Sequence, residues 1–155
     1  MRRVVAFDFN QTASCFDANR LSNICGKINQ RLGGEVTFVI FMGGGKPTQI
    51  APYYQGTLIQ AITDFDSYCP VDDSCLTREQ FVNLHEKAPV VVVDDDNYIG
   101  ETKLLHLRQI LNHPLGYSQK KSQEFVHFTD GIDNNITEET DGKLADSVVS
   151  AFGIS

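Results

Sequence analysis

The sequence has few basic residues, no long apolar run and no closely spaced cysteine pair, and each absence narrows what the protein can be. Its 13 basic residues against 20 acidic ones give a net charge of −7, whereas proteins that bind a phosphate backbone need a basic face. No apolar stretch approaches the roughly 20 residues of a membrane span. The chain also meets Asp8 after only four apolar residues, too soon for a signal-peptide core. We therefore expect a cytoplasmic or otherwise intracellular protein with no membrane partner, and the charge argues against nucleic acid without excluding it.

The four cysteines and four histidines do not have the spacing of a metal or nucleophile motif. No two cysteines are separated by two residues, which argues against a structural zinc site. The histidines form neither an HxxxH nor an HxH pair, and no serine lies in a G-x-S-x-G turn. Because lone histidines are more often packing or surface residues than bases, we expect no catalytic triad. The histidines are His85, His106, His113 and His127.

Short apolar runs alternate with stretches of helical periodicity. The runs are rich in β-branched and aromatic residues, which suits strands buried on both faces of a parallel sheet; they cover residues 4–9, 36–42, 90–93 and 125–128. Helical spacing predicts helices at 18–32, 58–65, 77–84, 104–111 and 144–152. The first of these helices follows Asp17 as its N-cap and ends at Gly33 and Gly34.

This succession predicts one α/β domain over residues 1–155, with a three-layer Rossmann-like arrangement of a mostly parallel sheet flanked by helices. The least regular part is rich in Gly, Pro, Tyr and Asp, and it predicts a loop insertion around residues 43–76. Within it, Gly43, Gly44 and Gly45 precede Lys46, as in a phosphate-binding loop. Because Pro47 follows the lysine where a serine or threonine is needed, a flexible loop is the better interpretation.

Polar residues follow three of the predicted strands. The first strand runs into Asp8, Asn10 and Thr12, the third into Asp94, Asp95 and Asp96, and the fourth into Thr129 and Asp130. Turns between strands and helices favour such residues as caps, so a single turn carries little weight. Three of them at one edge of a parallel sheet offer hard oxygen ligands, however, and predict a Mg²⁺ or Mn²⁺ site.

The fourth strand and its turn resemble a von Willebrand factor type A domain, in which an apolar strand runs into Thr-Asp-Gly, here Thr129, Asp130 and Gly131. The family's adhesion site also uses a D-x-S-x-S segment and a loop threonine. Asp8, Asn10 and Thr12 occupy the first positions with Asn10 in place of a serine, and Thr102 resembles the loop threonine. The resemblance implies a degenerate site for Mg or Mn with one position open to an acidic side chain of a partner protein. Its metal ligands would be Asp8, Asn10, Thr12, Thr102 and Asp130.

The first strand is also similar to the haloacid-dehalogenase-like phosphatases, whose first strand ends in D-x-D-x-T. In that interpretation Asp94 and Asp95 resemble the family's acidic fourth motif, and Lys87 is the candidate for its lysine. The resemblance implies phosphoryl transfer with Asp8 as nucleophile and Mg²⁺ on the phosphate. Asn10 stands where the family has its general acid, and an amide cannot transfer that proton. A phosphate-binding relative is therefore compatible with the sequence, whereas an efficient phosphatase is not.

A third resemblance is to PIN-like nucleases, in which clustered acids around Mg²⁺ or Mn²⁺ activate water to cleave RNA. The residues that carry it are Asp8, Asn10, Asp73, Asp95 and Asp130. We expect a protein-interaction module of the von Willebrand type with no catalytic residue. The alternative is a Mg- or Mn-dependent hydrolase of phosphate esters, in which Asp8, Asp94 and Asp95 are catalytic.

Overall fold

The computed structural model describes residues 3–9, 12–41, 59–63, 68–70, 83, 88–94, 125–127 and 138–153. For Phe41, residues 59–63, 68–70, 125–127 and 138–140 it describes the backbone alone. The described residues form an α/β structure with one sheet, two α-helices and a short 3-10 helix. Within them, no helix has both the length and the apolar character needed to cross a membrane.

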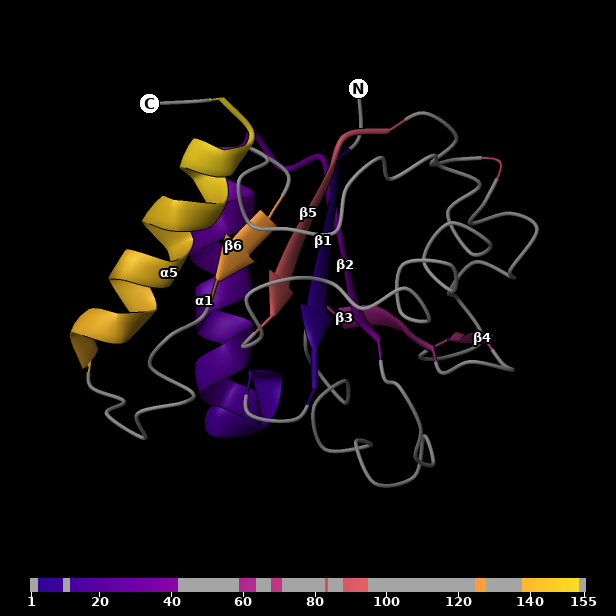
Figure 1. Cartoon of the computed structure of the whole chain (residues 1–155), viewed down its shortest axis with the longest axis horizontal. Helices are drawn as coiled ribbons and strands as arrows, with labels where there is room; N and C mark the ends of the chain where they lie inside the picture. Colours follow the sequence, from indigo (N-terminus) through magenta and orange to yellow (C-terminus); the bar gives the residue numbers. More distant parts are fainter. Residues whose placement is uncertain are drawn as a thin grey trace.

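The sheet has six strands in the order β4-β3-β2-β1-β5-β6. The strands are β1 (Arg3–Asp8), β2 (Val36–Phe41), β3 (Ile59–Thr63), β4 (Tyr68–Pro70), β5 (Val90–Asp94) and β6 (Phe125–His127). Every neighbouring pair is parallel except β3 with β4, so β4 is an antiparallel edge strand. Figure 1 shows β1 near the middle of the sheet, between β2 and β5. The four predicted strands are therefore confirmed as β1, β2, β5 and β6, each within a residue or two of its expected bounds.

The helix predicted at residues 58–65 is wrong, because Ile59–Thr63 is strand β3. Its apolar residues Ile59, Ala61 and Ile62 fit either helical or strand spacing, and a run of this length is ambiguous by periodicity alone. The segment becomes a strand because it pairs with its neighbours in the sheet, parallel to β2 and antiparallel to β4. Two strands thus come from the segment expected to be least regular. The helices predicted at 77–84 and 104–111 and the loop at Gly43–Lys46 lie outside the described residues, apart from Asn83.

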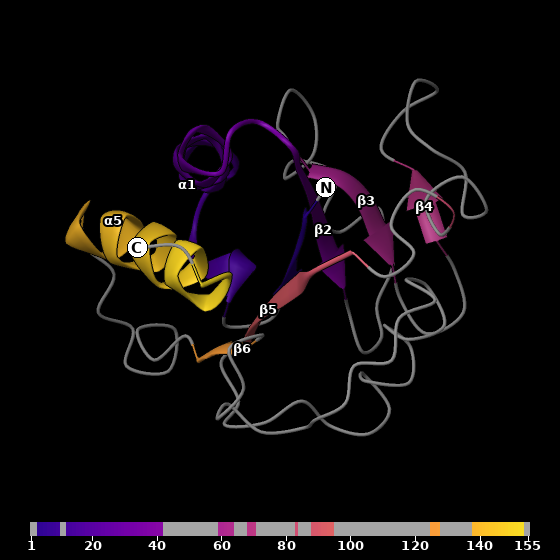
Figure 2. The ribbon, with the colours of Figure 1, turned by 90° about the horizontal axis from the view of Figure 1, so that it is seen from above.

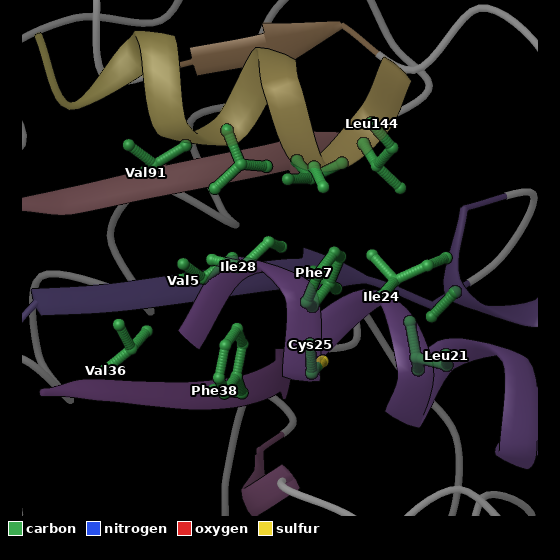
Figure 3. Packing of buried hydrophobic residues seen from close by; sticks show 14 of the residues in the cluster. Val5, Phe7, Leu21, Ile24, Cys25, Ile28, Val36, Phe38, Val91 and Leu144 are labelled. Atoms are coloured by element: carbon green, nitrogen blue, oxygen red, sulfur yellow. The ribbon is translucent and has the colours of Figure 1, made fainter. Parts of the chain in front are cut away.

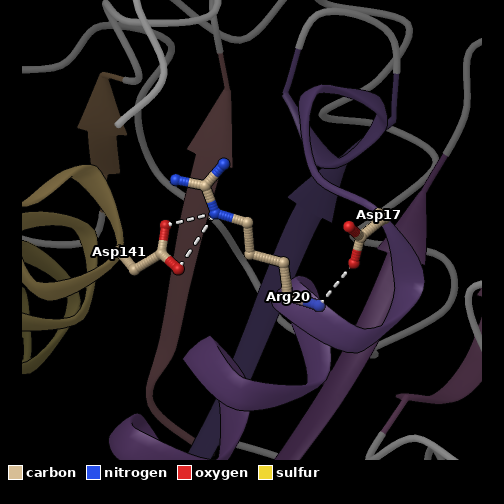
Figure 4. A network of polar contacts seen from close by, with 3 residues as sticks. All are labelled: Asp17, Arg20 and Asp141. Atoms are coloured by element: carbon tan, nitrogen blue, oxygen red, sulfur yellow. Dashed lines mark hydrogen bonds and ion pairs between the residues drawn. The ribbon is translucent and has the colours of Figure 1, made fainter. Parts of the chain in front are cut away.

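Helix α1 (Ala18–Arg31) begins and ends as the sequence predicts. Asp17 is its N-cap, and the Asp17 side chain accepts a 2.8 Å hydrogen bond from the Arg20 backbone N–H (Figure 4). At the other end Gly33 and Gly34 have φ values of 81° and 85°, a left-handed conformation that glycine adopts without strain. The Gly34 N–H donates to the Asn29 carbonyl at 2.8 Å and so closes the last turn. The predicted C-terminal helix is also confirmed, as α5 (Glu138–Ala151).

Helices α1 and α5 lie on the same side of the sheet, as Figure 2 shows. Between them and the sheet is one apolar cluster, seen in Figure 3, which includes alternate residues of β1, β2 and β5. The Phe7 and Phe38 rings stack in it with centroids 6.5 Å apart. The opposite face of these strands is buried too, since Ala6 and Val92 have no exposed surface. Burial on both faces explains why the strands have almost continuous apolar sequences.

Polar contacts also join the two helices, which are far apart in the sequence. The Arg20 guanidinium forms an ion pair with Asp141 of α5 at 2.9 Å (Figure 4), and its charge lies over the Phe16 ring. Arg31 and Asp146 form a second, more exposed pair. Because ion pairs near the surface contribute about 1 kcal/mol or less each, the apolar cluster is the main source of stability.

Candidate functional site

The centre of the sheet has the topology at which open α/β sheets bind ligands. The chain leaves β1 through α1 to β2 on one side, whereas β5 pairs with β1 on its other side. At such a switch point the two connections lead away in opposite directions, and a crevice opens beyond the carboxyl ends of the two central strands. In this protein those ends are Asp8 and Asp94.

Asp8 is the last residue of β1, and only 4% of its surface is exposed. The chain then turns back on itself, because the N–H groups of Thr12 and Ser14 both donate to the Phe9 carbonyl, at 3.2 and 2.9 Å. The turn leads into the 3-10 helix η1 (Ala13–Cys15) and buries Thr12 completely. The Thr12 hydroxyl donates to Asp8 Oδ2 over a long 3.4 Å contact. The structure therefore brings together two of the five predicted metal ligands, four positions apart in the sequence.

Asp94 is the last residue of β5 and is fully buried. Phe7 pairs with Val93 in the parallel β1–β5 register, so the next residues, Asp8 and Asp94, lie side by side. Phe7 and Val93 belong to the cluster beneath α1 and α5. Because successive residues of a strand point to opposite faces, the two aspartates lie on the face of the sheet away from those helices.

Two buried aspartates on neighbouring strands have strong electrostatic consequences. Adjacent strands lie about 4.8 Å apart, and two unit charges at roughly 5 Å repel by about 3 kcal/mol at an effective dielectric constant of 20. Burial also penalises the ionised form of each carboxyl group. Both aspartates have interaction partners within the protein. A shared proton or a bound cation would lower the remaining cost, and a cation does so without neutralising either carboxylate.

Part of the predicted site lies outside the described residues. Of the adhesion-type ligands these are Asn10, Thr102 and Asp130, and of the enzyme alternatives they are Asp73, Lys87 and Asp95. Among the residues whose side chains are described, no three His, Cys, Asp or Glu residues are grouped as they would be around a metal ion. The described donors are therefore two carboxylates and one hydroxyl, all hard oxygen groups of the kind that Mg²⁺ and Mn²⁺ prefer.

The sheet register places His127 next to one of the two buried aspartates. Asp94 of β5 pairs with His127 of β6, so that Asp8, Asp94 and His127 occupy one row across three adjacent strands. His127 was expected to be a packing or surface residue because it belongs to no histidine motif. This alignment cannot be predicted from the positions of these residues in the sequence, because the register depends on how the strands pair.

Comparisons with protein-family models, with curated proteins and with solved structures find no match for this chain.

Proposed function

We propose that this protein is a divalent-cation-dependent protein-interaction module, with a Mg²⁺ or Mn²⁺ site at the carboxyl ends of β1 and β5. The observation that carries the proposal is the position of Asp8 and Asp94, two buried carboxylates on neighbouring strands at the switch point of the sheet. Thr12 adds a hydroxyl that already contacts Asp8. The remaining ligands of the adhesion-type set would be Asn10, Thr102 and Asp130.

The strand order supports a Rossmann-like arrangement, on which the proposed cation site depends. The parallel strands β3-β2-β1-β5-β6 follow the order of a doubly wound sheet, 3-2-1-4-5. We propose that the fold is a three-layer Rossmann-like one, because the strands are buried on the face opposite α1 and α5 as well. The antiparallel edge strand β4 favours a von Willebrand type A domain, since that fold includes such a strand and a phosphatase need not.

In the proposed function the cation binds an acidic group of a partner protein. Two protein carboxylates and neutral oxygen ligands leave a divalent ion with coordination positions that water fills, as is usual for Mg²⁺. A carboxylate of a partner protein can replace one of these waters. Asp8, Asp94 and the net charge of −7 would otherwise repel such a partner, so the interaction would depend strictly on the cation.

One observation favours the second candidate, a Mg- or Mn-dependent hydrolase of phosphate esters. The strand beside β1 is β5, which ends in Asp94, whereas Thr129, Asp130 and Gly131 follow β6 in the sequence, and β6 is one strand further away. An acidic residue next to Asp8 is what the phosphatase and nuclease resemblances imply. In that function Asp8 and Asp94, with Asp95, would hold the ion that activates water or binds the phosphate.

The cation site is tested by titrating Mg²⁺ and Mn²⁺ into the wild-type protein and into Asp8→Ala and Asp94→Ala, followed by calorimetry or by NMR shifts. We expect binding by the wild type in the micromolar to millimolar range and its loss in both variants. Asp146→Ala is the matched control, because it removes a carboxylate whose side chain is 69% exposed on α5. If the wild type does not respond to millimolar metal, the proposal is wrong.

The two functions are separated by activity. The wild type is assayed with Mn²⁺ on an aryl phosphate and on a short single-stranded RNA. Turnover that disappears in Asp8→Ala and Asp95→Ala would establish the hydrolase and overturn the interaction module. Metal binding without turnover on either substrate is the result that the interaction module predicts.

A further inference from the structure

We draw no further inference here: the strongest candidate, the buried side-chain cluster of Asp8, Thr12 and Asp94 at the carboxyl edge of the sheet, belongs to the site already described, and all three residues have interaction partners within the protein.

Discussion

Replacing Asp94 by asparagine should make the metal-free protein more stable and at the same time abolish its response to metal. Asp94 is fully buried and lies beside Asp8 in the sheet. Asparagine has nearly the same shape and retains one carbonyl oxygen, but it has no charge. The substitution therefore removes the repulsion between two carboxylates and leaves the packing of β5 almost unchanged.

The size of the effect follows from two opposing quantities. Two charges about 5 Å apart repel by roughly 3 kcal/mol at an effective dielectric constant of 20. Asp94 has interaction partners that an amide satisfies less well, and a hydrogen bond to a charged group contributes about 1.5–3 kcal/mol. If the amide keeps half of that contribution, Asp94→Asn should raise the free energy of unfolding by about 1.5–2 kcal/mol.

Urea unfolding in EDTA and in Mn²⁺ measures both parts of this prediction. In EDTA the midpoint of Asp94→Asn should lie about 0.75–1 M above that of the wild type, for a urea dependence of roughly 2 kcal/mol/M. Mn²⁺ at ten times its dissociation constant should stabilise the wild type by about 1.4 kcal/mol and the variant much less. The gap between the two proteins should therefore narrow or reverse when metal is added.

The control is Asp146→Asn, which removes the same charge from the exposed surface of α5. It should change stability by no more than about 0.5 kcal/mol and leave the Mn²⁺ response intact. The reasoning is refuted if Asp94→Asn is destabilised by more than 1 kcal/mol in EDTA, because Asp94 would then be a structural residue whose partners outweigh the repulsion. An unchanged Mn²⁺ response in the variant would remove Asp94 from the metal site.

Three further predictions concern the rest of the fold. Phe38→Ala should cost about 3–5 kcal/mol of unfolding free energy in urea, because Phe38 is 1% exposed and stacks on Phe7. A double-mutant cycle on Arg20 and Asp141 should give a coupling of about 1 kcal/mol or less that shrinks in 1 M salt, and a salt-independent value would contradict an ion pair. Burial raises the pKa of the Cys25 thiol, so this thiol stays protonated in the folded state while the unfolded chain ionises above about pH 8.5. Folding stability should therefore fall above that pH in wild type, and less so in Cys25→Ala.

The sequence predicts those elements whose local chemistry and tertiary environment agree. Asp17 and Gly33 mark the ends of α1 because a carboxylate cap and a left-handed glycine act within a few residues of their own positions. The apolar runs that become β1, β2 and β5 are recognisable because both faces of these strands are buried. The sequence predicts a helix where strand β3 forms, because the conformation of this segment depends on pairing with β2 and β4 rather than on its own periodicity.

The candidate site also has features that could be predicted from the sequence and features that could not. That Asp8 and Asp94 end parallel strands could be predicted from the turns that follow those strands, and Thr12 from its spacing to Asp8. The position of Asp94 beside Asp8 could not be predicted from the sequence, because strand order is a property of the whole sheet. That Asp94 pairs with His127 could not be predicted either, because this pairing depends on the β5–β6 register.

Two aspartates buried side by side at the centre of the sheet need compensation for their charges, and both have interaction partners within the protein. The positions before them, Phe7 and Val93, are apolar and pack into the core, and neutral residues at positions 8 and 94 would complete the same strands without repulsion. Proteins break such local rules mainly where a ligand binds, and the repulsion between two buried carboxylates falls when a cation lies between them. An anionic ligand alone would add to the repulsion. In the proposed function a cation therefore binds first, and an acidic partner or a phosphate ester binds through that ion.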